Sequence, residues 1–144
     1  MSSASLGRSR PTKLPPQLGQ LRLTLEAPAT ARSGRPVPLV FSVRNAGKTS
    51  VTLQLLGRTP TADFVVEDSA GRRIWSLLRG QTMLGALRLH PLGPGQRLEW
   101  RHRWDQRTDG GEPVPPGQYL VRGVLLTDTP GGLSSPPFRL LITR

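Results

Sequence analysis

The chain has 144 residues, of which 35% are hydrophobic, 16 are glycine and 15 are proline. This length fits one domain with a tail, and the apolar share supports a modest core. The absence of cysteine excludes disulfides, zinc–thiolate sites and thiol nucleophiles. Twenty lysines and arginines against nine acids give a net charge of +11, which makes an anionic partner one function to consider.

Residues 1–18 are rich in serine, proline and arginine and contain no acid. Their prolines oppose regular structure, so we expect a flexible basic tail before a folded domain at residues 19–144. The chain has no apolar leader and no run of about 18 apolar residues. These absences predict a cytoplasmic protein without a membrane span, exported only if the true start lies upstream.

Period-two alternation of apolar residues predicts the first half of the domain to be short strands. The predicted strands lie at residues 21–25, 37–43, 51–55, 63–68 and 73–76. The turn at Asn45-Ala46-Gly47 is expected to join the second and third strands as a hairpin. The turn at Ser69-Ala70-Gly71 is expected to join the fourth and fifth in the same way. Residues 77–90 have mixed spacing and favour a strand near 86–90.

The strongest strand signal is at residues 98–104, where Leu98, Trp100, His102 and Trp104 share one face. Two further strands are predicted at 119–125 and 138–142. Tyr119 comes just after a Pro-Pro-Gly turn. A tyrosine in such a position, with its ring in the core and its hydroxyl free to bond the backbone, resembles the corner tyrosine of immunoglobulin-like sandwiches. About eight short strands without a long helix predict an all-β, immunoglobulin-like antiparallel β-sandwich.

The order of these motifs resembles the BsuPI family of intracellular proteinase inhibitors. The matching residues are Phe41, Val43, Asn45, Asp63, Phe64, Val66, Asp68, Gly71, Trp75, Pro94, Gly95, Trp100, Trp104, Asp105, Pro116, Gly117 and Tyr119. They span about residues 37–142. The resemblance implies an immunoglobulin-like sandwich and a role in inhibiting an intracellular subtilisin-type serine protease. It supplies no reactive-site residue that transfers to a numbered position here.

No catalytic, cofactor or metal site is predicted. The only histidines are His90 and His102, and no nucleophile-elbow pattern accompanies them. His102 is expected to pack on the inner face with a hydrogen-bond partner rather than to bind a metal. The carboxylates Asp63, Glu67, Asp68, Asp105 and Asp109 lack the close alternation of a calcium loop. We expect them to cap turns and pair with arginines.

Exposed loops are the predicted binding elements, because a preorganised loop reduces the entropy cost of association. The two candidate loops are residues 58–62 and 105–116, and prolines stiffen the second. The candidate contact residues are Arg58, Thr59, Pro60, Arg107, Asp109, Gly110, Gly111, Glu112, Pro113 and Val114.

Three functions therefore stay open. The first is a non-enzymatic inhibitor or regulator of an intracellular subtilisin-type serine protease, with a protein partner and no small-molecule substrate. The second is a generic immunoglobulin-like module for protein interaction or envelope association. The third is an electrostatic binder of an anionic partner such as nucleic acid. Arg97, Arg101, Arg103 and Arg122 are the candidate basic patch for this function, and a solvated outer face is the favoured alternative for them.

Overall fold

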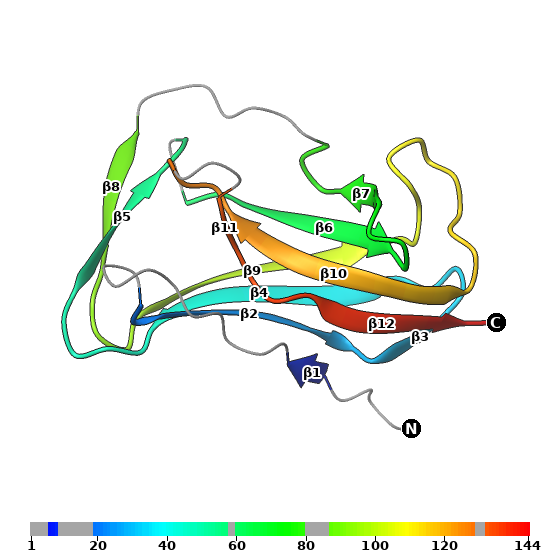
Figure 1. Cartoon of the computed structure of the whole chain (residues 1–144), viewed down its shortest axis with the longest axis horizontal. Helices are drawn as coiled ribbons and strands as arrows, with labels where there is room; N and C mark the ends of the chain where they lie inside the picture. The colour runs from blue at the N-terminus through cyan, green and yellow to red at the C-terminus, as the bar shows by residue number, and fades with distance from the viewer. Residues whose placement is uncertain (1–5, 9–18, 58–59, 80–86, 129–131) are drawn as a thin grey trace.

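The computed structural model describes residues 6–8, 19–57, 60–79, 87–128 and 132–144. Every regular element in these ranges is a strand, which confirms the all-β prediction (Figure 1). The twelve strands of the described residues are β1 (Leu6–Arg8), β2 (Leu21–Pro28), β3 (Thr30–Arg32), β4 (Val37–Asn45), β5 (Val51–Leu55), β6 (Ala62–Asp68), β7 (Arg73–Ser76), β8 (Arg88–Leu92), β9 (Arg97–Trp104), β10 (Gly117–Leu125), β11 (Leu133–Ser134) and β12 (Phe138–Thr143). None of the described residues belongs to a helix long and apolar enough to cross a membrane.

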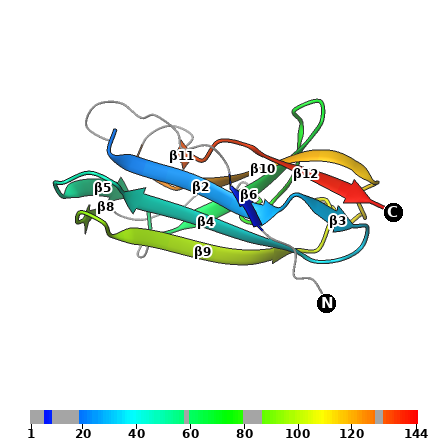
Figure 2. The same ribbon diagram turned by 90° about the horizontal axis from the view of Figure 1, so that it is seen from below.

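Two sheets form the sandwich, and Figure 2 shows them as two layers. The first sheet has the order β1-β2-β4-β9, and the second has the order β3-β12-β10-β6-β7 with β11 on β10. Strands that are neighbours in a sheet are mostly distant in the chain, and successive segments of the chain pass from one sheet to the other. This is the strand order of an immunoglobulin-like Greek key. Strands β5 and β8 pair with each other as a separate two-stranded sheet at one end.

The core lies between the layers and follows the predicted period of two. Strand β4 alternates buried and exposed residues along most of its length, and β12 does so throughout. On β9, Trp104 is fully buried, while Leu98 and Trp100 pack against the core from partly buried positions. The ring of Trp100 stacks on Phe41 at 5.5 Å between centroids. The aromatic face predicted at residues 98–104 is therefore the inner face.

The predicted hairpin between residues 37–43 and 51–55 is wrong, because β4 pairs with β2 and β9 while β5 pairs with β8. The fully buried Asn45 side chain explains the redirection. Its Nδ2 donates to the carbonyls of Thr49 and Leu92, both at 2.8 Å, and its Oδ1 accepts from the Gly47 amide at 3.0 Å. Asn45 thus turns the chain out of the first sheet.

Two further details differ from the sequence-based expectation. The strand expected near 86–90 is β8 at Arg88–Leu92, and residues 80–86 lie outside the described residues. The pairing of β3 with β12 is parallel, whereas the sandwich was expected to be antiparallel. The chain crosses from β2 in the first sheet to β3 in the second through Ala29, whose carbonyl accepts from the Leu141 amide at 2.9 Å.

Arg122 does not join the basic patch expected on β9. It lies on β10 in the second sheet, where its Nη2 is 2.7 Å from Oε1 of Glu67 on β6. Arg97 and Arg101 do share the outer face of β9 and flank Glu99, at 3.3 and 2.9 Å. The predicted patch is therefore divided between the two sheets.

Candidate binding loop at one end of the sandwich

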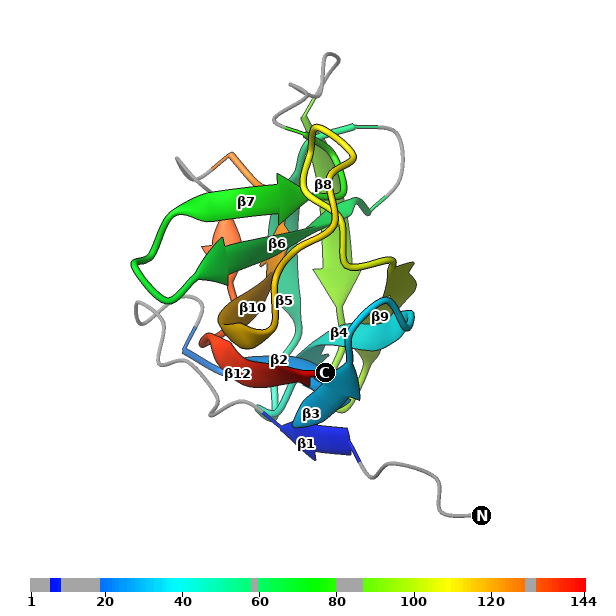
Figure 3. The same ribbon diagram turned by 90° about the vertical axis from the view of Figure 1, so that its right-hand side faces the viewer.

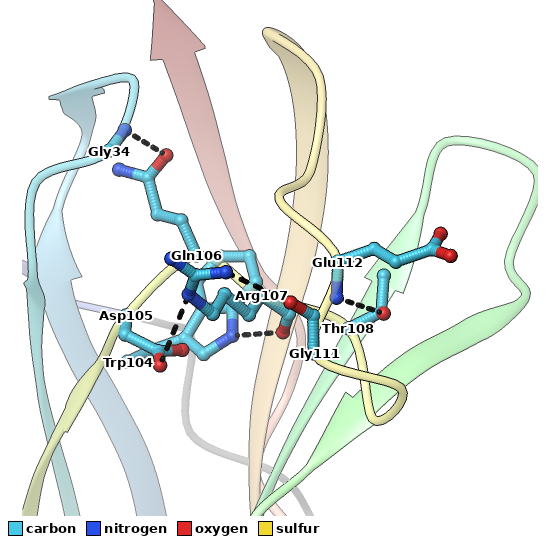
Figure 4. Close-up of polar contacts among 8 residues, drawn as sticks. All are labelled: Gly34, Trp104, Asp105, Gln106, Arg107, Thr108, Gly111 and Glu112. Atoms are coloured by element: carbon cyan, nitrogen blue, oxygen red, sulfur yellow. Dashed lines mark hydrogen bonds and ion pairs between the residues drawn. The ribbon is translucent and has the colours of Figure 1, made fainter.

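The loop at residues 105–116 joins β9 to β10 and lies at the end of the sandwich that carries the C-terminus (Figure 3). Its first anchor is Trp104, the last residue of β9, whose side chain is fully buried. The indole Nε1 of Trp104 donates to the main-chain carbonyl of Arg107 at 3.0 Å (Figure 4). The base of the loop is thereby bonded to the core.

Gln106 is the second anchor, and sequence reasoning missed it. Its side chain is 2% exposed. The amide Nε2 donates to the carbonyls of Arg32 and Arg35 at 2.7 and 2.8 Å, and Oε1 accepts from the Gly34 amide at 3.1 Å. Its φ of 60° lies in the left-handed region, which is costly for a residue with a Cβ. All three side-chain bonds are thus used to join two loops that are about 70 residues apart in the chain.

Within the loop the backbone forms a small hairpin. The Val114 amide donates to the Gln106 carbonyl at 2.9 Å, and the Thr108 amide donates to the Glu112 carbonyl at 2.8 Å. A turn closes the tip, where the Gly111 amide donates to the Thr108 carbonyl at 2.9 Å. Gly111 has a φ of +85°, which favours glycine at that position. The tip is therefore folded back on itself rather than extended.

Asp109 forms the third anchor by bonding the tip to the edge strand β7. Its amide donates to the Ile74 carbonyl at 3.0 Å, and its Oδ1 accepts from the Ser76 amide at 3.0 Å. Its Oδ2 also lies 3.3 Å from Nη2 of Arg73. The loop consequently covers an edge of the second sheet that would otherwise present unpaired backbone groups.

The last part of the loop, which contains Pro113, Pro115 and Pro116, also contacts the core. Val114 is 4% exposed, and the Pro115 carbonyl accepts a hydrogen bond from the Tyr119 hydroxyl. Burial, and secondarily the charge of Asp68, raises the pKa of Tyr119 above its ordinary value, so the hydroxyl stays a donor. This is the corner-tyrosine arrangement predicted from the sequence.

The predicted contact residues of the loop at residues 105–116 differ in their exposure to solvent. Arg107, Gly110, Gly111, Glu112 and Pro113 are exposed, whereas Asp109 is half-buried and Val114 is buried. The first five residues form the accessible surface of the hairpin.

The second predicted loop does not join this surface. Arg58 and Thr59 lie outside the described residues, and the half-buried Pro60 accepts a hydrogen bond from Trp100 Nε1 at 3.3 Å. Strand β6 starts at Ala62 opposite Leu125 and ends at Asp68 opposite Tyr119. Pro60, which precedes β6, is therefore at the end of the sandwich away from the loop at residues 105–116.

The described residues contain no group of three or more histidine, aspartate, glutamate or cysteine side chains that could hold a metal ion. His102 packs against two aromatic rings, with centroid distances of 6.1 Å to Phe64 and 5.7 Å to Trp75. Within the described ranges its imidazole makes no hydrogen bond, although one was expected. Its surroundings are those of a core side chain.

Comparison with solved structures finds similar chains at low sequence identity. The chain is similar to β-glucosidase from Listeria innocua in complex with glucose, with 12% identity, a TM-score of 0.48, and coverage of 86% of this chain but 16% of that one. It is also similar to the CARDB domain of PF1109 from Pyrococcus furiosus in complex with di-metal ions, with 12% identity, a TM-score of 0.45, and coverage of 85% and 87%. The alkylpurine DNA glycosylase AlkC of Pseudomonas fluorescens, bound to DNA containing an abasic site analog, gives 19% identity and a TM-score of 0.41 over 78% of this chain and 27% of that one.

No curated protein matches the sequence. The sequence does match one family, described as BsuPI, intracellular proteinase inhibitor, over residues 23–129. The match includes 107 of the 144 residues and extends from β2 through β10. It contains the aromatic strand β9, the anchored loop and the corner tyrosine, and the chain therefore belongs to the BsuPI family of intracellular proteinase inhibitors.

Proposed function

We propose that this protein is a non-enzymatic inhibitor or regulator of an intracellular subtilisin-type serine protease, and that it acts in the cytoplasm. Membership in the BsuPI family supports the class of partner. The observation that carries the proposal is the hairpin at residues 105–116, which is anchored at three points and still exposes its tip. The binding surface consists of Arg107, Gly110, Gly111, Glu112 and Pro113.

Preorganisation supports the hairpin as the contact element. A loop that is already ordered loses little conformational entropy when it binds, so more of the contact energy becomes affinity. The anchors at Trp104, Gln106 and Asp109 bond this loop to three separate parts of the sandwich. The sandwich thereby serves as a rigid platform for one small projecting surface.

The geometry of the tip also suggests how contact is made. A substrate-like inhibitor offers an extended strand to the protease cleft, but here the Gly111 amide bonds the Thr108 carbonyl in a tight turn. We therefore propose that the hairpin obstructs the protease by its shape and does not enter the cleft as a peptide substrate. An inhibitor of this kind stays uncleaved through the assay.

The direct experiment is titration of a purified intracellular subtilisin-type protease with this protein. We expect activity to fall linearly to an equivalence point, with the inhibitor intact on a gel. Full activity at large molar excess would reject the proposal, and cleavage within the loop would reject the obstruction mechanism.

Glu112→Arg is the informative variant for the contact surface. The Glu112 side chain is exposed, and it makes no hydrogen bond or ion pair with any other described residue. Reversing its charge should weaken inhibition about tenfold or more without lowering the melting temperature, because charges at an interface centre are costly when mismatched. The matched control is Lys48→Glu, an exposed charge reversal in the turn after the end of β4, whereas the hairpin follows Trp104, which pairs with the start of β4. Equal inhibition by both variants would exclude the tip as the contact.

The domain boundary is part of the same proposal. We assign binding to residues 19–144 and treat residues 1–18 as a separate tail, although residues 6–8 pair with β2 as strand β1. A chain that starts at residue 19 should inhibit as well as the full chain. Loss of inhibition in a truncated protein that still folds would place part of the binding surface before residue 19.

A further inference from the structure

Three arginines lie directly opposite one another across the outer face of the first sheet. The strand register aligns Arg22 of β2 with Arg44 of β4, and Arg44 with Arg97 of β9. All three are exposed. Neighbouring strands are about 4.8 Å apart, so the three side chains rise from adjacent positions in one row. Figure 2 shows β2, β4 and β9 side by side on this face. We call these residues the arginine row.

The charge of the row is only partly compensated. Nη1 of Arg22 donates to main-chain carbonyls of Gly19 and Leu21, at 3.0 and 3.2 Å. Nη2 of Arg97 lies 3.3 Å from Glu99, but that carboxylate also binds Arg101 at 2.9 Å. The side chain of Arg44, in the centre, makes no hydrogen bond or ion pair with any described residue. Like charges directly opposite each other destabilise a sheet, so the row favours the addition of an anion.

The row borders a shallow open groove of about 580 Å³. The next row consists of Thr24, Ser42 and Glu99, of which Thr24 and Ser42 carry hydroxyl groups and line the groove. Thr24 is buried, so Ser42 offers the more accessible hydroxyl group. Guanidinium groups bind oxyanions through paired N–H donors, and hydroxyl groups add single donors. Glu26, one row further along β2, also lines the groove. Its carboxylate restricts an anion to the end of the groove that the arginines occupy.

We propose that the arginine row is a binding site for a small multivalent phosphate anion of the pyrophosphate class. The planar guanidinium fork suits phosphate oxygens better than a lysine ammonium does, and every charged residue of the row is arginine. Among the residues that line this groove there is no aromatic side chain to stack a nucleic-acid base. The donors are confined to a row three strands wide, which fits a compact anion better than a long polymer.

This site is independent of the proposed protease contact. The row lies next to Asn45, where β4 ends, whereas the 105–116 hairpin follows Trp104, which pairs with Val37 where β4 begins. The two surfaces therefore occupy opposite ends of the first sheet. Loss of phosphate binding should leave protease inhibition unchanged, and loss of inhibition should leave phosphate binding unchanged.

The test is thermal melting with and without pyrophosphate at constant ionic strength, for wild type and for Arg44→Gln. We expect pyrophosphate to raise the melting temperature of wild type, because a ligand that binds only the folded state stabilises it. Arg44→Gln should melt at the same temperature as wild type or higher without ligand, and should bind pyrophosphate about tenfold or more weakly. Arg103→Gln is the matched control, because Arg103 is an exposed arginine of the same sheet face outside the row.

The outcomes separate the proposal from non-specific electrostatics. An equal response of wild type and Arg44→Gln to pyrophosphate would overturn it, as would an equal loss of response in Arg103→Gln. A single-stranded oligonucleotide is the second probe. Binding of the oligonucleotide that pyrophosphate cannot displace would also overturn the proposal, since it would assign the row to a nucleic-acid backbone. Displacement at the affinity measured by melting would support it.

Discussion

Gln106 offers the sharpest test of how the binding loop is built. Its side chain makes three hydrogen bonds to the backbone of residues 32–35, while its own backbone adopts a φ of 60°. Replacement by alanine removes the three bonds and keeps the Cβ. Replacement by glycine also removes the bonds but relieves the left-handed backbone, and replacement by glutamate turns the amide donor into an acceptor.

The expected cost follows from these contacts. A hydrogen bond contributes about 1 kcal/mol net, so three give an upper value of about 3 kcal/mol. Arg32 and Arg35 are exposed residues, so their carbonyls can partly turn to water, which lowers the expected cost of Gln106→Ala to about 2 kcal/mol. Gln106→Gly should cost about 1 kcal/mol less than the alanine variant. Gln106→Glu should cost the most, because its carboxylate would face two carbonyls at 2.7 and 2.8 Å.

Urea unfolding at neutral pH measures the three free energies of unfolding. The prediction is an order, with glutamate least stable, then alanine, then glycine, and wild type most stable. A cost below about 0.5 kcal/mol for Gln106→Ala would refute the anchoring role, since that is within the range of ordinary surface changes. A glutamate variant as stable as wild type would show that Nε2 is not the donor that matters. If the hairpin contacts a protease, Gln106→Ala should also weaken inhibition at temperatures where it stays folded.

Three further predictions concern the sandwich itself. Gly123→Ala should lower the free energy of unfolding, measured in urea, by about 1–3 kcal/mol or more, because the new Cβ would lie 2.2 Å from ring carbons of the buried Phe41. An unchanged free energy of unfolding would mean that the two sheets separate easily. Tyr119→Phe should cost about 1 kcal/mol through the lost hydroxyl bond and leave the far-ultraviolet spectrum unchanged. Burial raises the pKa of Asp63 above its ordinary value of 3.8, although the Leu78 amide donates to the carboxylate. The folded state thus holds this proton more tightly than the unfolded chain, and the resulting stability is lost as pH rises through the folded pKa. The free energy of unfolding of Asp63→Asn should therefore increase relative to that of wild type as pH rises through the folded pKa of Asp63. A difference between the two proteins that shrinks as pH rises would contradict this reasoning.

The elements of this fold that depend on local pattern could be predicted from the sequence. Alternation placed the inner face of β9, because side-chain direction in a strand depends only on parity. The corner tyrosine could also be located from a local pattern, the Pro-Pro-Gly turn before Tyr119. The Tyr119 hydroxyl donates to the carbonyl of Pro115, only four residues earlier. The turn at 69–71 was correct because Asp68 Oδ1 accepts from the nearby amides of Ala70 and Arg72, all within one short segment.

The errors concern choices between partners that are distant in sequence. Asn45-Ala46-Gly47 has the composition of a hairpin turn, yet Asn45 Nδ2 bonds the Leu92 carbonyl 47 residues away. That buried bond joins the end of β4 to the end of β8, and the identity of the distant partner cannot be read from residues 37–55 alone. Gln106 could not be recognised either, because a lone glutamine after a tryptophan has no pattern, and its partners at Arg32 and Arg35 are more than 70 residues upstream.

The basic charge illustrates the same distinction between composition and placement. The arginines are dispersed along the sequence, and a dispersed distribution suggests an unremarkable solvated surface. Register brings Arg22, Arg44 and Arg97 into one row, although 75 positions separate the first from the last. Arg122, in contrast, lies on β10 in the other sheet and forms an ion pair with Glu67. Electrostatic function in a β-sandwich is therefore decided by strand pairing more than by net charge. For this protein the informative electrostatic experiment is the neutralisation of Arg44, at the centre of the row, rather than a general reduction of its +11 charge.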